Sequence, residues 1–187
     1  MPFDPNAADL TVGVIGTGTM GRGIMQVSAQ GGMRVIAYDE KPGAAQAAKD
    51  YIAKTLAGLV EKGRVTEGDA KAAVDRVTVA SDLAEVAKAD VVIEAILEQL
   101  EAKQALFAKL EAHARPDAIL ASNTSSIPIT AIASKLKHPE RVGGMHFFNP
   151  VPLMRLVEII PGLRTAPWVT DAMMALGRRM TREPVLC

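Results

Sequence analysis

The sequence is poor in cysteine, histidine and aromatic residues, and it carries no excess of charge of either sign. Its 187 residues include one cysteine, Cys187, which excludes an internal disulfide and any site built from several thiolates. The three histidines, His113, His138 and His146, lack the spacing of metal ligands, so we expect no metal. The 21 basic residues balance 21 acidic ones, which argues against a nucleic-acid partner or a polybasic membrane-surface protein.

Long apolar runs are also missing. None approaches the roughly 18 residues that cross a bilayer, and the first ten residues are acidic and contain proline, unlike a signal peptide. We therefore expect a cytoplasmic protein that does not enter a membrane. A hydrophobic content of 49% is ample for one core, and we expect residues 1–187 to form a single domain.

Short runs with β-branched residues alternate with longer helical patterns, which is typical of an α/β domain. We predict strands over residues 11–16, 34–39, 77–80, 90–95, 118–121, 141–146 and 156–160. We predict helices over residues 19–30, 43–62, 99–113, 128–135 and 166–179. Shorter helices are expected after Thr66 with Asp69, and after Ser81 or Asp82 as the cap. The sequence therefore predicts a doubly wound, mostly parallel sheet.

A glycine-rich segment, Gly-Thr-Gly-Thr-Met-Gly at residues 16–21, follows the first predicted strand and opens the first predicted helix. Gly16 permits a tight turn, Gly18 lets a pyrophosphate approach the backbone, and Gly21 lets helix and strand pack closely. The first amides of the helix, at Thr19 and Met20, would face the phosphate charge. The segment predicts a dinucleotide site.

The second predicted strand ends at Asp39, where a carboxylate can accept hydrogen bonds from ribose hydroxyls. The acidic pair Asp39 and Glu40 would repel a 2′-phosphate, so NAD is favoured over NADP, although Lys41 adds a positive charge. The alternative interpretation is a helix-capping aspartate beside structural glycines. The spacing favours a Rossmann-type NAD site.

Two further motifs carry polar residues next to apolar runs: Ser-Asn-Thr-Ser-Ser at 122–126 and Gly-Met-His-Phe-Phe-Asn-Pro-Val-Pro-Leu-Met-Arg-Leu-Val-Glu at 144–158. His146 is a poor base unless a partner holds its tautomer, and Glu158 on the next apolar run can be that partner. The alternative is a core histidine beside a surface glutamate. The serine-rich motif can also be a strand-to-helix crossing, with Ser126 capping the helix after Pro128.

Together with the glycine loop, these motifs resemble the L-3-hydroxyacyl-CoA dehydrogenase family along residues 12–187, most closely its short-chain, 3-hydroxybutyryl-CoA type. The resemblance implies NAD-dependent interconversion of 3-hydroxyacyl-CoA and 3-ketoacyl-CoA, in fatty-acid β-oxidation or in short-chain hydroxybutyryl-CoA metabolism. It makes His146 the catalytic base and Glu158 its orienting partner. It gives Ser125 and Asn149 polar contacts to the reacting oxygen and the acyl group.

The resemblance also implies contacts outside the catalytic pair. Glu98 and Lys103 correspond to positions that contact the cofactor on its nicotinamide side, whereas Thr55 and Lys62 correspond to coenzyme A contacts. The alternative for Lys103 is a solvated charge on a helix face. For Thr55 and Lys62, which are two helical turns apart, it is an ordinary exposed basic face.

In the resembling family a second, helical domain closes the substrate cleft and forms a homodimer, and this chain stops before it. We expect the sequence to continue in the natural protein, since residues 183–187 resemble the start of a strand or a domain crossing. We expect the chain alone to bind NAD, to turn over slowly and to self-associate through an apolar face that includes methionines and Trp168. The alternatives are an NAD-dependent dehydrogenase of a free 3-hydroxy acid or sugar acid, and a non-catalytic dinucleotide-binding protein.

Overall fold

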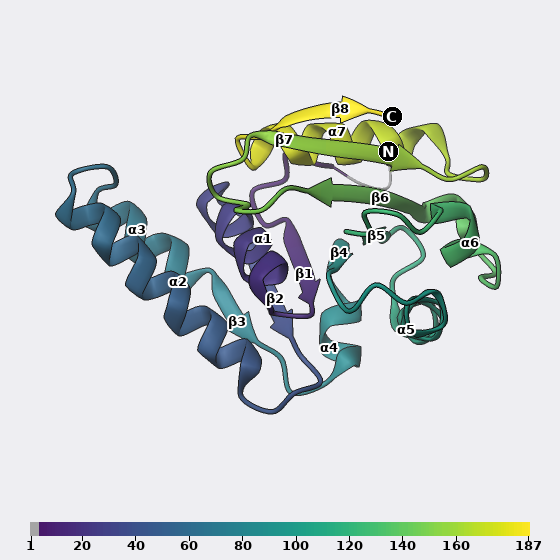
Figure 1. The fold of residues 1–187 in the computed structure, drawn as a ribbon, viewed down its shortest axis with the longest axis horizontal. Coiled ribbons are helices and arrows are strands. Elements are labelled where there is room, and N and C mark those ends of the chain that lie inside the picture. Colours follow the sequence, from purple (N-terminus) through teal and green to yellow (C-terminus); the bar gives the residue numbers. More distant parts are fainter. Residues whose placement is uncertain (1–3) are drawn as a thin grey trace.

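The computed structural model describes residues 4–187 and shows one twisted sheet with helices on both faces (Figure 1). Its strands are β1 (Thr11–Ile15), β2 (Arg34–Tyr38), β3 (Val77–Val79), β4 (Val91–Glu94), β5 (Ile119–Ser122), β6 (Val142–Phe147), β7 (Leu156–Pro161) and β8 (Glu183–Leu186). Its α-helices are α1 (Thr19–Gln30), α2 (Ala44–Glu61), α3 (Glu67–Asp75), α4 (Leu83–Ala87), α5 (Leu100–His113), α6 (Ile129–Ala133) and α7 (Pro167–Arg179). A short 3-10 helix, η1 (Pro139–Arg141), precedes β6.

The strand order is β3-β2-β1-β4-β5-β6-β7-β8. All neighbouring strands from β3 to β6 are parallel, β7 is antiparallel to β6, and β8 is parallel to β7. The prediction of a doubly wound, mostly parallel sheet is confirmed. From β1 the strands follow one another outward to β3 on one side, and from β4 they follow one another outward to β6 on the other. A crevice therefore opens beyond the carboxyl ends of β1 and β4, where such sheets bind ligands.

The core consists of two apolar layers, one on each face of the sheet. Along β4, Val91 and Ile93 belong to one layer and Val92 to the other, as the alternation of a strand requires. Helices α1, α2, α3 and α7 cover the first layer, and α4, α5 and α6 cover the second. Both faces are therefore shielded, which explains why the central strands are continuous apolar runs.

Most predicted elements are confirmed with ends that differ by one or two residues. The Thr66 hydroxyl accepts a hydrogen bond from the Asp69 amide at the start of α3, and Asp82, rather than Ser81, caps α4 through the Glu85 amide. The end of the chain is a strand, β8, paired with β7.

Helix α6 is shorter than predicted, and the alternative interpretation of Ser126 as its cap is wrong. The Ala131 carbonyl accepts from the Ser134 hydroxyl and from the Gln104 side chain, each at 2.8 Å, so side chains satisfy it where the helix ends. Residue Pro128, which has no side-chain donor or acceptor, precedes the helix, so Ser126 does not cap it.

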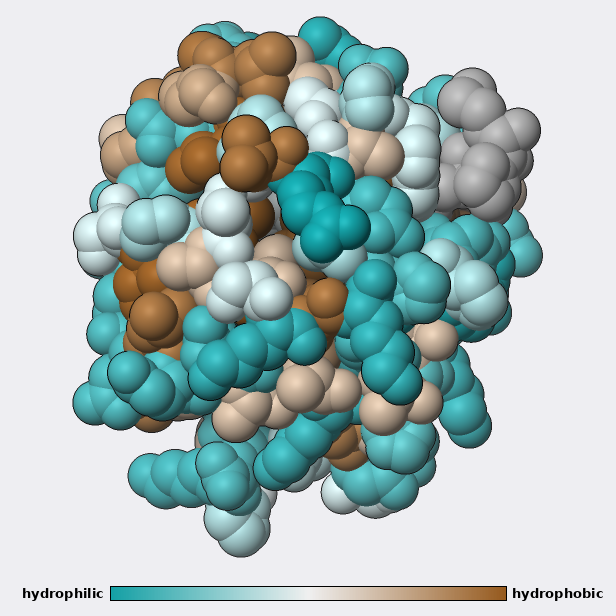
Figure 2. All heavy atoms as spheres, turned by 90° about the vertical axis from the view of Figure 1, so that its right-hand side faces the viewer, coloured by the Kyte–Doolittle hydropathy of each residue, from teal (hydrophilic) through white to brown (hydrophobic). Residues whose placement is uncertain are grey.

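The surface differs from expectation at Trp168, which is half-buried and packs against the core instead of lying on an exposed apolar face. Among residues 4–187, the most exposed large apolar side chains are Leu163 and Leu153, at 87% and 74%. Figure 2 shows hydrophobic residues in separate groups among hydrophilic ones on one face of the molecule. Within residues 4–187, no helix combines the length and apolar character needed to span a membrane.

The packing of α1 on β1 depends on Gly21, because a Cβ there would lie 1.7 Å from the Gly16 carbonyl oxygen. We expect Gly21→Ala to lower the free energy of unfolding by at least about 3 kcal/mol, the upper range for overpacking, because backbone cannot move aside. Gly58→Ala is the control: a Cβ inside α2 meets no described atom within 4 Å. That variant should be up to about 1 kcal/mol more stable. Equal denaturation midpoints for the two variants would contradict this account.

Candidate active site

Two adjoining hollows lie at the carboxyl ends of the parallel strands. The larger, of about 760 Å³, is lined by the ends of β1, β2 and β4, including Gly16, Gly18 and Asp39. The smaller, of about 340 Å³, lies beyond β4, β5 and β6. Its lining includes Met20, Glu98, Asn123, Ser125, His146, Phe148 and Asn149. Ala95 and Ile96 line both hollows, so an elongated ligand can extend from one into the other.

The glycine loop leaves the start of α1 open to a ligand. Gly16 has φ of +82°, a left-handed conformation, and a Cβ there would lie 2.7 Å from the Ala95 carbonyl oxygen. Gly18 caps α1 without a side-chain hydrogen bond, and a Cβ there would meet none of the described atoms within 4 Å. The unshielded amides of α1 and this open space fit the pyrophosphate of NAD.

Asp39 joins the end of β2 to the glycine loop. Its Oδ2 accepts from the Thr17 amide at 2.7 Å and hydroxyl at 2.8 Å, and its Oδ1 accepts from the Lys41 amide at 3.0 Å. Burial opposes ionisation, but these hydrogen bonds outweigh it and hold the pKa of Asp39 below its ordinary value. The charged carboxylate therefore both fixes the loop and faces the larger hollow, as a ribose contact would require.

Glu98 lies at the smaller hollow and clamps the serine-rich motif. Its Oε1 accepts from the Thr124 hydroxyl and from the amides of Ser125 at 2.9 Å and Ser126 at 3.3 Å. Partial burial alone would raise the pKa of Glu98, but these bonds and the ammonium of Lys103 lower it to about 2. Glu98 is thus a fixed negative charge beside Ser125.

Lys103 is buried, with 1% of its surface exposed, so its interpretation as a solvated helix-face charge is wrong. Its Nζ lies 2.6 Å from Glu94 Oε1 and 3.2 Å from Glu98 Oε2. Lys103 therefore reaches the smaller hollow through Glu98, and direct contact with a cofactor stays a prediction.

His146 and Glu158 face each other across the antiparallel pair of β6 and β7, as register partners. The imidazole Nδ1 lies 2.8 Å from Glu158 Oε2, and the Phe148 ring packs on the imidazole with 4.5 Å between centroids. Because a carboxylate only accepts, Nδ1 carries the proton and Nε2 remains for a ligand. This geometry favours the orienting-partner interpretation over two independent residues.

The structure brings Ser125 and Asn149 to the same hollow as His146. It also shows contacts of residues to which the sequence assigned no individual role. The Asn123 side chain accepts from the Phe147 amide at 2.8 Å and so ties the loop after β5 to β6. Glu94 and Ser122 are buried at the ends of β4 and β5. The sequence does contain a signal for Glu94, because a glutamate there ends an otherwise apolar strand.

Thr55 lies on α2 and Lys62 directly follows it, and neither lines the two hollows. The Thr55 hydroxyl donates to the Tyr51 carbonyl oxygen at 2.9 Å, and Lys62 is exposed at the end of the helix. Their role as coenzyme A contacts stays a prediction.

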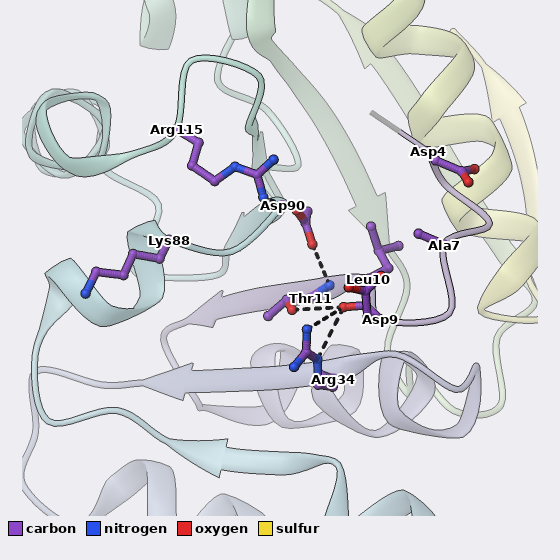
Figure 3. Close-up of a pocket in the computed structure, with 9 residues that line it drawn as sticks. All are labelled: Asp4, Ala7, Asp9, Leu10, Thr11, Arg34, Lys88, Asp90 and Arg115. Atoms are coloured by element: carbon purple, nitrogen blue, oxygen red, sulfur yellow. Dashed lines mark hydrogen bonds and ion pairs between the residues drawn. The ribbon is translucent and has the colours of Figure 1, made fainter. Parts of the chain in front are cut away.

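Another hollow, of about 400 Å³, lies at the amino-terminal edge of the sheet (Figure 3). Three of its charged side chains have partners within the lining: Asp90 accepts from the Thr11 amide and pairs with Arg115 at 2.5 Å, while Arg34 donates to the Asp9 carbonyl oxygen. These contacts stabilise the edge opposite the glycine loop.

Residues 11–187 match the family model described as "3-hydroxyacyl-CoA dehydrogenase, NAD binding domain". The chain is 45% identical over 177 residues to the 3-hydroxyadipyl-CoA dehydrogenase of Escherichia coli K12, with 95% of this chain and 37% of that protein covered. It is 46% identical over 172 residues to a probable 3-hydroxybutyryl-CoA dehydrogenase of Bacillus subtilis, with 92% and 60% covered.

A solved structure of a 3-hydroxybutyryl-CoA dehydrogenase from Escherichia coli K12 superposes with a TM-score of 0.93 at 45% identity. The match covers 96% of this chain and 38% of that one. The chain therefore spans between 37% and 60% of the length of these relatives.

Asp39 is the first test of the cofactor site. We expect Asp39→Ala to weaken NAD binding by about 1.5–3 kcal/mol, the range for hydrogen bonds to a charged group. Isothermal calorimetry measures this, with Asp50→Ala as a control that removes an exposed carboxylate from α2. Unchanged affinity for NAD in Asp39→Ala, or tighter binding of NADP than of NAD by the parent, would show that the assignment is wrong.

Glu98 should make stability depend on pH. Its pKa is about 2 in the fold against 4.5 ordinarily, so the folded state binds fewer protons there than the unfolded state. The resulting stability is present above about pH 4.5 and is lost as pH falls toward about 2. We expect Glu98→Gln to lose less stability than the parent between about pH 5 and 3 in urea titrations. Parallel curves for the two proteins would contradict the shift.

Proposed function

Because this chain belongs to the 3-hydroxyacyl-CoA dehydrogenase family, matching its NAD-binding domain, we propose that its protein interconverts 3-hydroxyacyl-CoA and 3-ketoacyl-CoA. The observation that carries the proposal is the 2.8 Å contact between His146 and Glu158 at a hollow that adjoins the glycine-loop crevice. Oxidation of a carbinol removes a proton from its oxygen and a hydride from its carbon. A base can accept the proton, and a dinucleotide in the crevice can accept the hydride. The names of the relatives support a coenzyme A thioester as the substrate.

In the oxidative direction, Nε2 of His146 accepts the proton of the substrate hydroxyl. The Glu158 carboxylate keeps the proton of Nδ1 in place and stabilises the imidazolium that forms. NAD, when bound in the crevice, supplies the acceptor for the hydride that leaves the carbon bearing this hydroxyl. In the reverse direction the imidazolium of His146 returns the proton to the ketone oxygen.

Ser125 and Asn149 orient the reacting oxygen toward His146. The Ser125 amide donates a hydrogen bond to Glu98. The Ser125 hydroxyl therefore lies on a loop that is fixed in place. Asn149 follows β6 three residues after His146 and lines the same hollow. Fixed donors at this position favour one orientation of the substrate, which raises the rate through proximity.

The coenzyme A moiety is proposed to lie against α2, through Thr55 and Lys62. Lys54 and Arg64 are exposed nearby and add positive charge that suits the phosphates of coenzyme A.

Substrate preference separates this proposal from its alternatives. We expect the natural full-length protein to oxidise NADH with acetoacetyl-CoA much faster than with acetoacetate, because the free acid lacks the coenzyme A contacts. Absorbance at the NADH band measures both rates. Faster turnover of acetoacetate would favour a dehydrogenase of free acids, and bound NAD without turnover of either compound would favour a non-catalytic protein.

His146 and Glu158 should act as one unit. In the full-length protein, His146→Gln should lower turnover of acetoacetyl-CoA by about 10²–10⁴-fold, the general-base range. Glu158→Gln should also be costly, and the double variant should be little worse than the worse single variant. Glu183→Gln, which alters an exposed carboxylate on β8, is the control. Fully additive losses would mean that the two residues work independently.

A further inference from the structure

Glu94, the last residue of β4, is a fully buried carboxylate that lines neither hollow. Its Oε1 accepts from Lys103 Nζ at 2.6 Å and from the Ile96 amide at 2.7 Å, and its Oε2 accepts from the Ser122 hydroxyl at 2.7 Å. A buried charge is costly unless paired and hydrogen-bonded, and Glu94 is both. It is therefore held in one orientation between β4, β5 and α5.

Two chains of contacts lead from Glu94 to the loop that carries Ser125. Through one oxygen, Glu94 fixes Lys103, whose Nζ lies 3.2 Å from Glu98 Oε2. Through the other, it fixes Ser122, whose hydroxyl accepts from the Thr124 amide at 3.2 Å. Both chains meet at residues 124–126, because Glu98 Oε1 binds the Thr124 hydroxyl and the Ser125 amide.

The ammonium of Lys103 is shared by two carboxylates, and Glu94 is the closer of them. With Glu94 charged, Lys103 contacts only Oε2 of Glu98, and Oε1 remains for the loop. Without that charge, Glu98 alone would balance a buried ammonium, and attraction toward Lys103 would draw Glu98 away from Ser125.

We propose that Glu94 is a positioning residue, which sets Glu98 and the Thr124–Ser126 loop at the smaller hollow without touching a ligand. It deepens the proposed function, since this hollow is where the nicotinamide end of the cofactor and the substrate oxygen would meet. The tests below use no acyl substrate, so their failure is distinguishable from failure of the proposed activity.

Glu94→Gln keeps the shape of the side chain and removes its charge. We expect the ¹⁵N–¹H resonances of Ser125 and Ser126 to shift in the free chain, and NAD to bind about tenfold more weakly, as for one weakened hydrogen bond to a charged group. Asp75→Asn is the matched control, because it breaks an exposed carboxylate–ammonium pair with Lys71 in α3. The control should leave both resonances and the affinity unchanged.

Loss of stability alone does not distinguish positioning from a structural role. The proposal is overturned if Glu94→Gln folds, its Ser125 and Ser126 resonances do not move, and its NAD affinity stays within twofold of that of the parent. If Glu94→Gln does not fold, Glu94→Asp carries the test, since it keeps the charge but withdraws the carboxylate from Lys103 and Ser122. Positioning predicts shifted Ser125 and Ser126 resonances and weaker NAD binding in Glu94→Asp. Parental values in that variant would show that Glu94 serves only to neutralise Lys103.

Discussion

The parallel arrangement of the strands from β3 to β6 is the constraint on which the site depends. Strands that run in one direction end at one edge, and connections of the chain return there after each strand. Asp39, Glu94, Ser122 and His146 are far apart in sequence, yet each lies at the end of a strand or within one residue of it, at this edge. The reversal of winding between β1 and β4 then opens the crevice between them.

The site also needs one exception to this order. β7 runs antiparallel to β6, and this places Glu158 opposite His146 at a fixed register. A parallel neighbour would need a long crossover, whereas the segment between β6 and β7 is short. The apolar residues of β6 and β7 pack in the core. A shift of the pairing by one residue would turn these side chains away from the core and expose them. The geometry of the pair His146 and Glu158 is thus secured by the same burial that stabilises the sheet.

Much of this arrangement follows from local sequence, because helices and strands here carry clear periodicity and caps. The glycine loop, Asp39, and the pairing of His146 with Glu158 were all predictable from motif and spacing. The burial of Lys103 was not, since a lysine on a helix is ordinarily solvated, and only the fold brings Glu94 and Glu98 to either side of it. At the end of α6, the Ala131 carbonyl accepts a hydrogen bond from Gln104, a residue of another helix. Long-range polar contacts of this kind leave no periodic signal.

We propose that one continuous site crosses both hollows, with the adenosine end of NAD at Asp39 and the nicotinamide end beside His146. A crystal structure of the chain with NAD tests it most directly. The account predicts a ribose hydroxyl on the Asp39 carboxylate, the pyrophosphate at Gly18, and the nicotinamide ring between Glu98 and the imidazole of His146. A cofactor bound at the amino-terminal edge of the sheet, or with its nicotinamide directed away from His146, would contradict it.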